Sequence, residues 1–98
     1  MSNKGINYTH KFDYDRNKSI SNLLKHGIDF VCSQKLWDDP NAIEVQTKYT
    51  EESRYVVIGI IGRKHWSAII TFRGERIRII SVRRSRVKEV ELYENQEI

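Results

Sequence analysis

The chain has 98 residues, of which 39% are hydrophobic and 31% are charged, and its formal net charge is +4. This length supports one domain with a small core and excludes two, and the apolar content excludes a disordered chain. The charge is concentrated: residues 54–88 contain ten Lys or Arg and one acidic residue, Glu75, for a net charge of +9, while residues 1–53 carry −1 and residues 89–98 carry −4. Such a basic block is typical of a protein with a nucleic-acid partner.

Two kinds of protein are disfavoured by what the sequence lacks. There is no apolar run long enough to span a bilayer and no secretory signal pattern, which predicts a cytoplasmic protein with no membrane partner. The single cysteine, Cys32, has no second cysteine to pair with, and His10, His26 and His65 are scattered singly. We therefore predict no disulfide, no metal site and no cofactor.

The first ten residues predict a flexible leader, and residues 11–98 predict a single domain. Residues 11–15 alternate in character around Phe12 and Tyr14 and predict a short first strand.

A helix is predicted over residues 16–26. Asp15 or Asn17 can cap its first turn, and Gly27 supplies the left-handed residue that commonly ends a helix. Three apolar residues fall at helical spacings on one face, which predicts an amphipathic helix with this face toward the core: Ile20, Leu23 and Leu24.

A second short helix is predicted between residues 30 and 37. It stops before Pro40, because the residue ahead of a proline resists helical angles, so residues 38–41 form a turn. A polar loop is expected at residues 48–53.

Three β-rich runs follow, at residues 54–61, 66–72 and 76–82, and their short connections predict an antiparallel meander.

A last helix is predicted to begin near Arg86 with Ser85 as its cap. Its buried stripe would contain Val87, Val90 and either Leu92 or Tyr93, and its glutamates would form a solvated face: Glu89, Glu91, Glu94 and Glu97. The predicted fold class is α+β.

The pairing of the last two strands can be predicted from the Gly74-Glu75 turn. If these two residues form the turn, Arg73 pairs with Arg76, Thr71 with Arg78 and Ala68 with Ser81. Alternation along the strands then places five residues on a core face: Ala68, Ile70, Phe72, Ile77 and Ile79.

The opposite face of the same strands would be basic at one end. A four-residue connection at residues 62–65 would place Arg54 opposite Arg73. Together with Arg76 and Arg78, these arginines would form one cluster. Arginine suits phosphate because its planar fork of donors contacts two oxygens at once.

The order of these motifs resembles the BrnT toxins. The resemblance covers residues 11–95 and is carried mainly by Lys25-His26-Gly27-Ile28-x-Phe30 and by Arg78-Ile79-Ile80-Ser81-x-Arg83-Arg84. It implies a RelE-like fold and a metal-independent ribonuclease that inhibits translation, within a bacterial type II toxin–antitoxin pair. It also implies a BrnA-like antitoxin with a ribbon-helix-helix part, through which the complex binds DNA and represses its own operon.

For RNA cleavage, the arginines are candidates for stabilising the charge that develops on the phosphate. Arg78 is the first candidate, with Arg54 beside it. Arg83 and Arg84 would contact the scissile or a flanking phosphate, and Arg73 and Arg76 either bind RNA or keep the turn soluble.

The groups that transfer protons are not determined by the sequence. His26 is either a proton-transfer group or a residue that complements the end of its helix. Lys25 either stabilises charge or is a solvated helix lysine, and Tyr93 either stacks on a base or packs in the core.

Two other functions remain open at this point. A non-catalytic RNA- or DNA-binding module would have the same basic block. An inactive toxin-like protein that serves as a repressor subunit is the second alternative.

Overall fold

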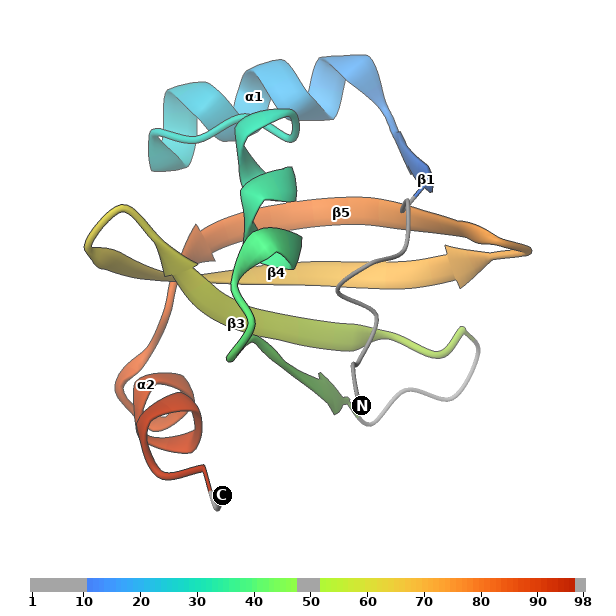
Figure 1. Ribbon diagram of the computed structural model, residues 1–98. Helices are drawn as coiled ribbons and strands as arrows, with labels where there is room; N and C mark the ends of the chain where they lie inside the picture. Colours follow the sequence, from blue (N-terminus) through green and yellow to red (C-terminus); the bar gives the residue numbers. More distant parts are fainter. Residues whose placement is uncertain (1–10, 48–51, 97–98) are drawn as a thin grey trace.

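The structure, a computed structural model, describes residues 11–47 and 52–96. The expected leader at residues 1–10 lies outside these ranges, as do residues 48–51 of the expected polar loop and Glu97. The elements are β1 (Lys11–Tyr14), α1 (Arg16–His26), the 3₁₀ helix η1 (Cys32–Asp38), β2 (Ile43–Gln46), β3 (Tyr55–Ile61), β4 (Lys64–Arg73), β5 (Arg76–Arg84) and α2 (Val87–Glu94) (Figure 1).

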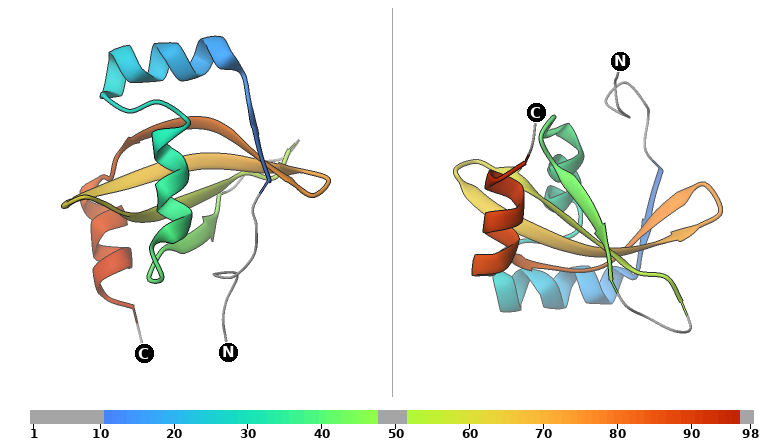
Figure 2. Two further views of the ribbon diagram at one scale, coloured as in Figure 1. Left: turned by 45° about the horizontal axis from the view of Figure 1, so that its top comes forward. Right: turned by 90° about the horizontal axis from the view of Figure 1, so that it is seen from below.

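Five strands form one mixed sheet in the order β1-β5-β4-β3-β2. β3, β4 and β5 form the predicted antiparallel meander, β2 adds to it antiparallel, and β1 pairs parallel with β5. The fold is therefore α+β, as predicted. Helix α1 runs along the β5 edge, η1 crosses one face of the sheet, and α2 lies at the end of the sheet away from β1 (Figures 1 and 2).

Helix α1 begins and ends where the sequence predicts. Oδ1 of Asp15 accepts hydrogen bonds from the backbone N–H groups of Asn17 (2.8 Å) and Lys18 (3.1 Å), which have no partner inside the helix. Gly27 has a φ of 82°, and its N–H donates to the carbonyl of Leu23.

The side of α1 that meets the sheet is polar, so the predicted core-facing stripe is wrong. Ser19 and Asn22 are buried, whereas Ile20, Leu23 and Leu24 are 53%, 47% and 84% exposed. Helical spacing correctly groups these three residues on one side, but that side faces away from the sheet.

Asn22 explains this orientation. Its Nδ2 donates to the carbonyls of Ile28 and Val82 (both 2.8 Å), and its Oδ1 accepts from the N–H of Val82 (3.1 Å). β1 pairs with β5 only as far as Ile79. Asn22 therefore satisfies the backbone groups of the next part of this strand, which would otherwise be buried without partners.

The β4–β5 hairpin has the predicted two-residue turn. Arg73 pairs with Arg76, and Gly74 has a φ of 61°, which a glycine adopts without strain. The predicted pairing of Thr71 with Arg78 is also confirmed.

Farther along this hairpin, a β-bulge changes the predicted register. Ala68 pairs with Val82 and not with Ser81, because Ile80 is inserted as an extra residue where the ladder shifts. Val82 consequently enters the core, where its exposed fraction is 0%, although unbroken alternation after Ile79 would place it on the opposite face.

The predicted connection between β3 and β4 is wrong. Only Gly62 and Arg63 join the two strands, and Gly62 has a φ of 67°. The shorter turn moves the register by two residues, so Arg54 does not lie opposite Arg73.

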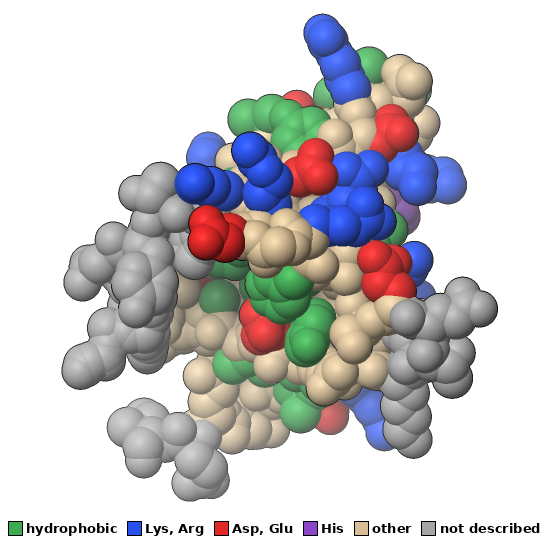
Figure 3. Space-filling model, turned by 90° about the vertical axis from the view of Figure 1, so that its right-hand side faces the viewer, with side chains coloured by type: hydrophobic (Ala, Val, Ile, Leu, Met, Phe, Trp, Pro, Cys, Tyr) green, Lys and Arg blue, Asp and Glu red, His purple; other side chains and the backbone are tan. Residues whose placement is uncertain are grey.

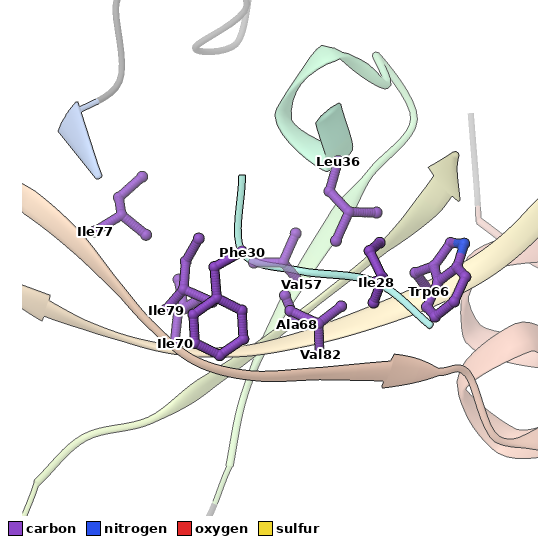
Figure 4. Packing of buried hydrophobic residues seen from close by; sticks show 10 residues of the cluster. All are labelled: Ile28, Phe30, Leu36, Val57, Trp66, Ala68, Ile70, Ile77, Ile79 and Val82. Atoms are coloured by element: carbon purple, nitrogen blue, oxygen red, sulfur yellow. The ribbon is translucent and has the colours of Figure 1, made fainter. Parts of the chain in front are cut away.

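The hydrophobic core lies between the sheet and the segment that leads into η1 (Figure 4). Phe30 and Leu36 are fully buried there. The cluster contains Ile28, Phe30, Leu36, Val57, Trp66, Ala68, Ile70, Ile77, Ile79 and Val82. Phe72, which was predicted to be a core residue, is 44% exposed and packs edge-on against Tyr55 with 5.2 Å between ring centroids.

Helix α2 begins at Val87, with Arg86 and not Ser85 at its N-cap. Of the predicted stripe, Tyr93 is buried, whereas Val87 is 73% and Leu92 is 52% exposed. None of the helices in the described ranges has the length and apolarity needed to cross a membrane.

Candidate nucleic-acid interface

β5 carries polar and basic side chains on the sheet face opposite the core. Alternation places Arg76 and Arg78 on this face and, after the bulge, Ser81 and Arg83. At about 3.3 Å per residue, Arg78 and Arg83 are roughly 15 Å apart along the strand. Figure 3 shows Lys and Arg side chains gathered over the end of the molecule that holds the β4–β5 turn, with acidic side chains among them.

Arg78 is held by a carboxylate on the neighbouring strand. Its Nη1 lies 2.9 Å from Oδ2 of Asp13, and the two side chains are 27% and 37% exposed. The hydrogen bond from Arg78 is the main reason that the pKa of Asp13 lies below its usual range. The pair orients Arg78 on the open face and partly neutralises it.

Arg54 and Arg73 come together through an acidic residue. Nη2 of Arg54 lies 3.8 Å from Oε1 of Glu52, and Nη2 of Arg73 lies 3.4 Å from Oε2 of the same carboxylate. Arg76 is exposed across the turn from Arg73. Of the predicted cluster, Arg54, Arg73 and Arg76 come together, and Arg54 reaches Arg73 through Glu52 and not through the predicted strand pairing.

Arg83 forms a two-point ion pair with Glu89 of α2. Its Nη1 and Nη2 contact Oε1 (2.7 Å) and Oε2 (2.9 Å), and the carboxylate also accepts from the Ser67 hydroxyl and the Arg86 N–H. The Arg83 hydrogen bonds lower the pKa of Glu89 to about 2 and raise the pKa of Arg83. The prediction of a solvated Glu89 is wrong, since its side chain is 17% exposed.

Arg84 lies on the other face of the sheet. Its guanidinium carbon is 5.6 Å from the ring centroid of Trp66, and its Nε donates to the carbonyl of His65 (3.2 Å). Because successive residues of a strand point to opposite faces, Arg83 and Arg84 are not brought to the same phosphate.

A groove between α1 and β5 is lined by two of the predicted site residues, Lys25 and His26, together with residues that were not predicted. It has a volume of about 170 Å³. Its lining consists of Lys18, Ser21, Asn22, Lys25, His26, Ile80 and Ser81. None of these residues is acidic, and among the described residues no carboxylate forms an ion pair with Lys18, Lys25 or His26.

The comparison with known families places this geometry in context. Residues 14–89 match the family described as the ribonuclease toxin BrnT of type II toxin–antitoxin systems. The chain belongs to the BrnT family. It is accordingly a ribonuclease toxin whose partner is an antitoxin. No match was found among curated proteins.

Tyr93 of this BrnT toxin has a packing role. It is 7% exposed, and its hydroxyl donates to Oδ2 of Asp39 at 2.7 Å, which fastens α2 to the turn after η1. Burial, together with this bond, raises the pKa of Tyr93 to about 12. The ring is not accessible for stacking on a base, so the geometry disfavours the predicted RNA contact.

The groove adds residues that the sequence analysis did not select. Lys18 precedes Lys25 by seven residues, which is two helical turns, so the sequence did contain a signal that they share one side. Ser81 had no such signal, because its position depends on the bulge at Ile80. The match to the BrnT family spans Lys18, Lys25 and His26 of the groove as well as the β5 arginines.

Proposed function

We propose that this BrnT toxin is a metal-independent endoribonuclease that binds RNA along the open face of β5 and cleaves it at the groove beside α1. The proposal rests on one difference between two sets of basic side chains, namely whether they contact a carboxylate. The arginines at 54, 73, 78 and 83 each contact a carboxylate. Lys18, Lys25 and His26 line a groove without one, and two uncompensated lysines in a groove suit a phosphodiester.

The chemistry requires three tasks of these side chains. The 2′-hydroxyl must lose a proton, the charge on the five-coordinate phosphate must be stabilised, and the leaving 5′-oxygen must gain a proton. Lys18 and Lys25 supply positive charge for the second task, and His26 is the groove residue whose imidazole can serve as the proton-transfer group. In the described part of the chain, no three His, Cys, Asp or Glu side chains converge as metal ligands would.

The arginines are assigned supporting positions in this proposal. Arg78 binds a phosphate next to the groove, since its pair with Asp13 is accessible to solvent. Arg54, Arg73 and Arg76 bind RNA beyond it. Arg83 is a positioning residue that fixes α2 through Glu89, and we do not place it at the scissile phosphate. The fold is RelE-like in this proposal.

The antitoxin of the proposal is BrnA-like. It neutralises the toxin, and its ribbon-helix-helix part binds the operon DNA, so that the complex represses its own transcription. The support is the family's place in type II toxin–antitoxin systems. A gel shift of operon DNA by the complex but not by the toxin alone is the expected result. A shift by the toxin alone contradicts the proposed route to DNA.

The cleavage proposal is tested with purified toxin and end-labelled RNA in EDTA. Wild type should cleave, leaving a 2′,3′-cyclic phosphate. His26→Gln should lower the cleavage rate by about 100-fold or more while RNA is still bound. Lys25→Ala should weaken both binding and cleavage, because it removes charge from the groove.

Arg63→Ala is the matched control, since it removes one positive charge from the exposed β3–β4 turn. It should bind and cleave like wild type. If His26→Gln and Lys25→Ala both cleave at the wild-type rate, the site is wrongly placed. If cleavage stops in EDTA and returns with a divalent cation, the metal-independent mechanism is wrong.

A further inference from the structure

Helix α1 presents an apolar stripe to solvent. Leu24, Ile20 and Leu23 are 84%, 53% and 47% exposed, and they lie at spacings of three and four residues that share one side of a helix. Single exposed apolar side chains are common on soluble proteins. Three on one helix, with polar residues on the buried side, mark an interaction surface.

The stripe does not result from loose packing of α1. The Ser19 hydroxyl accepts a hydrogen bond from the N–H of Phe30 (2.9 Å), and Asn22 forms its three bonds to the backbone of Ile28 and Val82. These contacts fix the helix with its apolar side outward. The stripe therefore contributes little to folding, and its hydrophobic character needs another explanation.

The charge of α1 indicates which partner fits the stripe. The helix contains Arg16, Lys18 and Lys25 and no acidic residue. Two copies of the chain joined through α1 would bring like charges together, which opposes self-association. A partner with apolar anchors flanked by carboxylates complements both features.

We propose that the stripe of Ile20, Leu23 and Leu24 is the docking site for an acidic amphipathic helix of the antitoxin. Its apolar side covers the stripe, and its carboxylates pair with Lys18 and Lys25. Helix α1 has eleven residues and is about 16 Å long. A helix of this length is too short to bury the roughly 800 Å² per partner of a standard interface by itself, so the antitoxin also extends beyond α1.

This docking mode also accounts for how the antitoxin inhibits RNA cleavage, and this part of the inference rests on the proposed function. Lys18 and Lys25 line the RNA groove on the same helix. An antitoxin helix bound to the stripe places negative charge at these lysines. RNA and antitoxin then compete for the same cations.

The test measures binding of the proposed BrnA-like antitoxin to the full toxin chain by isothermal titration calorimetry. The double variant Leu23→Ser/Leu24→Ser should raise the Kd by about 30-fold or more, as expected for anchor residues. Val87→Ser/Leu92→Ser is the matched control, because these residues of α2 are 73% and 52% exposed. It should leave the Kd unchanged.

Circular dichroism and thermal unfolding confirm that the variants fold. Leu24→Ser alone, at the most exposed position, replaces the double variant if that protein is unstable. An unchanged Kd for the stripe variant overturns the proposal. So does a wild-type dimer that becomes monomeric in the stripe variant, because the occupant would then be a second copy.

RNA cleavage distinguishes this inference from the function on which it partly rests. The stripe variant should cleave RNA like wild type and resist inhibition by the antitoxin. If wild type does not cleave RNA, the proposed function fails, while the comparison of Kd values still decides the docking site.

Discussion

Replacing Glu89 by Gln should destabilise the toxin by about 2 kcal/mol at pH 7. Arg83 contacts both carboxylate oxygens, and these bonds lower the pKa of Glu89 from 4.5 to about 2. At about 1.4 kcal/mol per unit of pKa, the lowering of the Glu89 pKa corresponds to about 3 kcal/mol of unfolding free energy. The Glu89 side chain is 17% exposed, and solvent screening reduces the expected value to about 2 kcal/mol.

The loss should depend on pH in a defined direction. A carboxyl group whose pKa is lowered by folding stabilises the folded state fully above its unfolded pKa, near 4.5, and loses this contribution as the pH falls toward 2. The difference between wild type and Glu89→Gln should therefore shrink steadily over this range. Urea titrations followed by the fluorescence of Trp37 and Trp66 measure it at each pH.

Glu91→Gln is the matched control, because it makes the same change in the same helix at an exposed side chain. It should change the unfolding free energy little at any pH. The reasoning is refuted if Glu89→Gln is as stable as wild type at pH 7. That result would mean that the cost of removing the Glu89 carboxylate from water cancels its attraction to Arg83.

Three further substitutions test individual contacts by thermal unfolding. Asn22→Ala should cost about 3 kcal/mol, because it leaves the backbone groups of Val82 without partners, and a cost below about 1 kcal/mol would mean that water replaces the amide. Tyr93→Phe should cost about 1 kcal/mol through the lost bond to Asp39 and leave RNA cleavage unchanged; reduced cleavage would return Tyr93 to the site. Gly27→Ala should cost about 1 kcal/mol because of the φ of 82°, and equal stability would contradict this.

The features of the fold that depend on neighbouring residues were predictable. Asp15 and Gly27 mark the two ends of α1 through contacts within a few residues, and the Gly74 turn determines the pairing at the tip of the hairpin. The bulge was not predictable, because Ile80 carries no turn signal of its own. The parallel pairing of β1 with β5 depends on distant parts of the chain as well.

The orientation of α1 shows what periodicity omits. The spacing of Ile20, Leu23 and Leu24 identifies residues on one side, and the hydrophobic effect alone would turn that side inward. The backbone of β5 has unpaired groups at its edge, and Asn22 can satisfy them while a leucine cannot. Such a requirement is visible only when the strand edge is known.

The sequence identified the basic candidate site residues, but it did not show which of them form ion pairs with carboxylates. Alternation correctly placed Arg78 on the open face, and the motif that contains Lys25 and His26 does lie beside β5. The carboxylates Asp13 and Glu89 come from elements that meet the arginines only in the folded chain. The sequence therefore could not show which basic side chains remain without an acidic neighbour.

The position of α1 links the two proposals to the fold. Asn22 fixes the helix to β5 and Ser19 fixes it to Phe30, and these bonds direct Lys25 toward the groove and Leu24 toward solvent. Because the directions differ, a substitution at Leu24 can weaken the antitoxin contact without changing the groove. Lys25 lies between the two surfaces, so its loss should impair both RNA cleavage and antitoxin binding. A variant of Lys25 that loses cleavage but binds the antitoxin with full affinity would show that the two surfaces are independent.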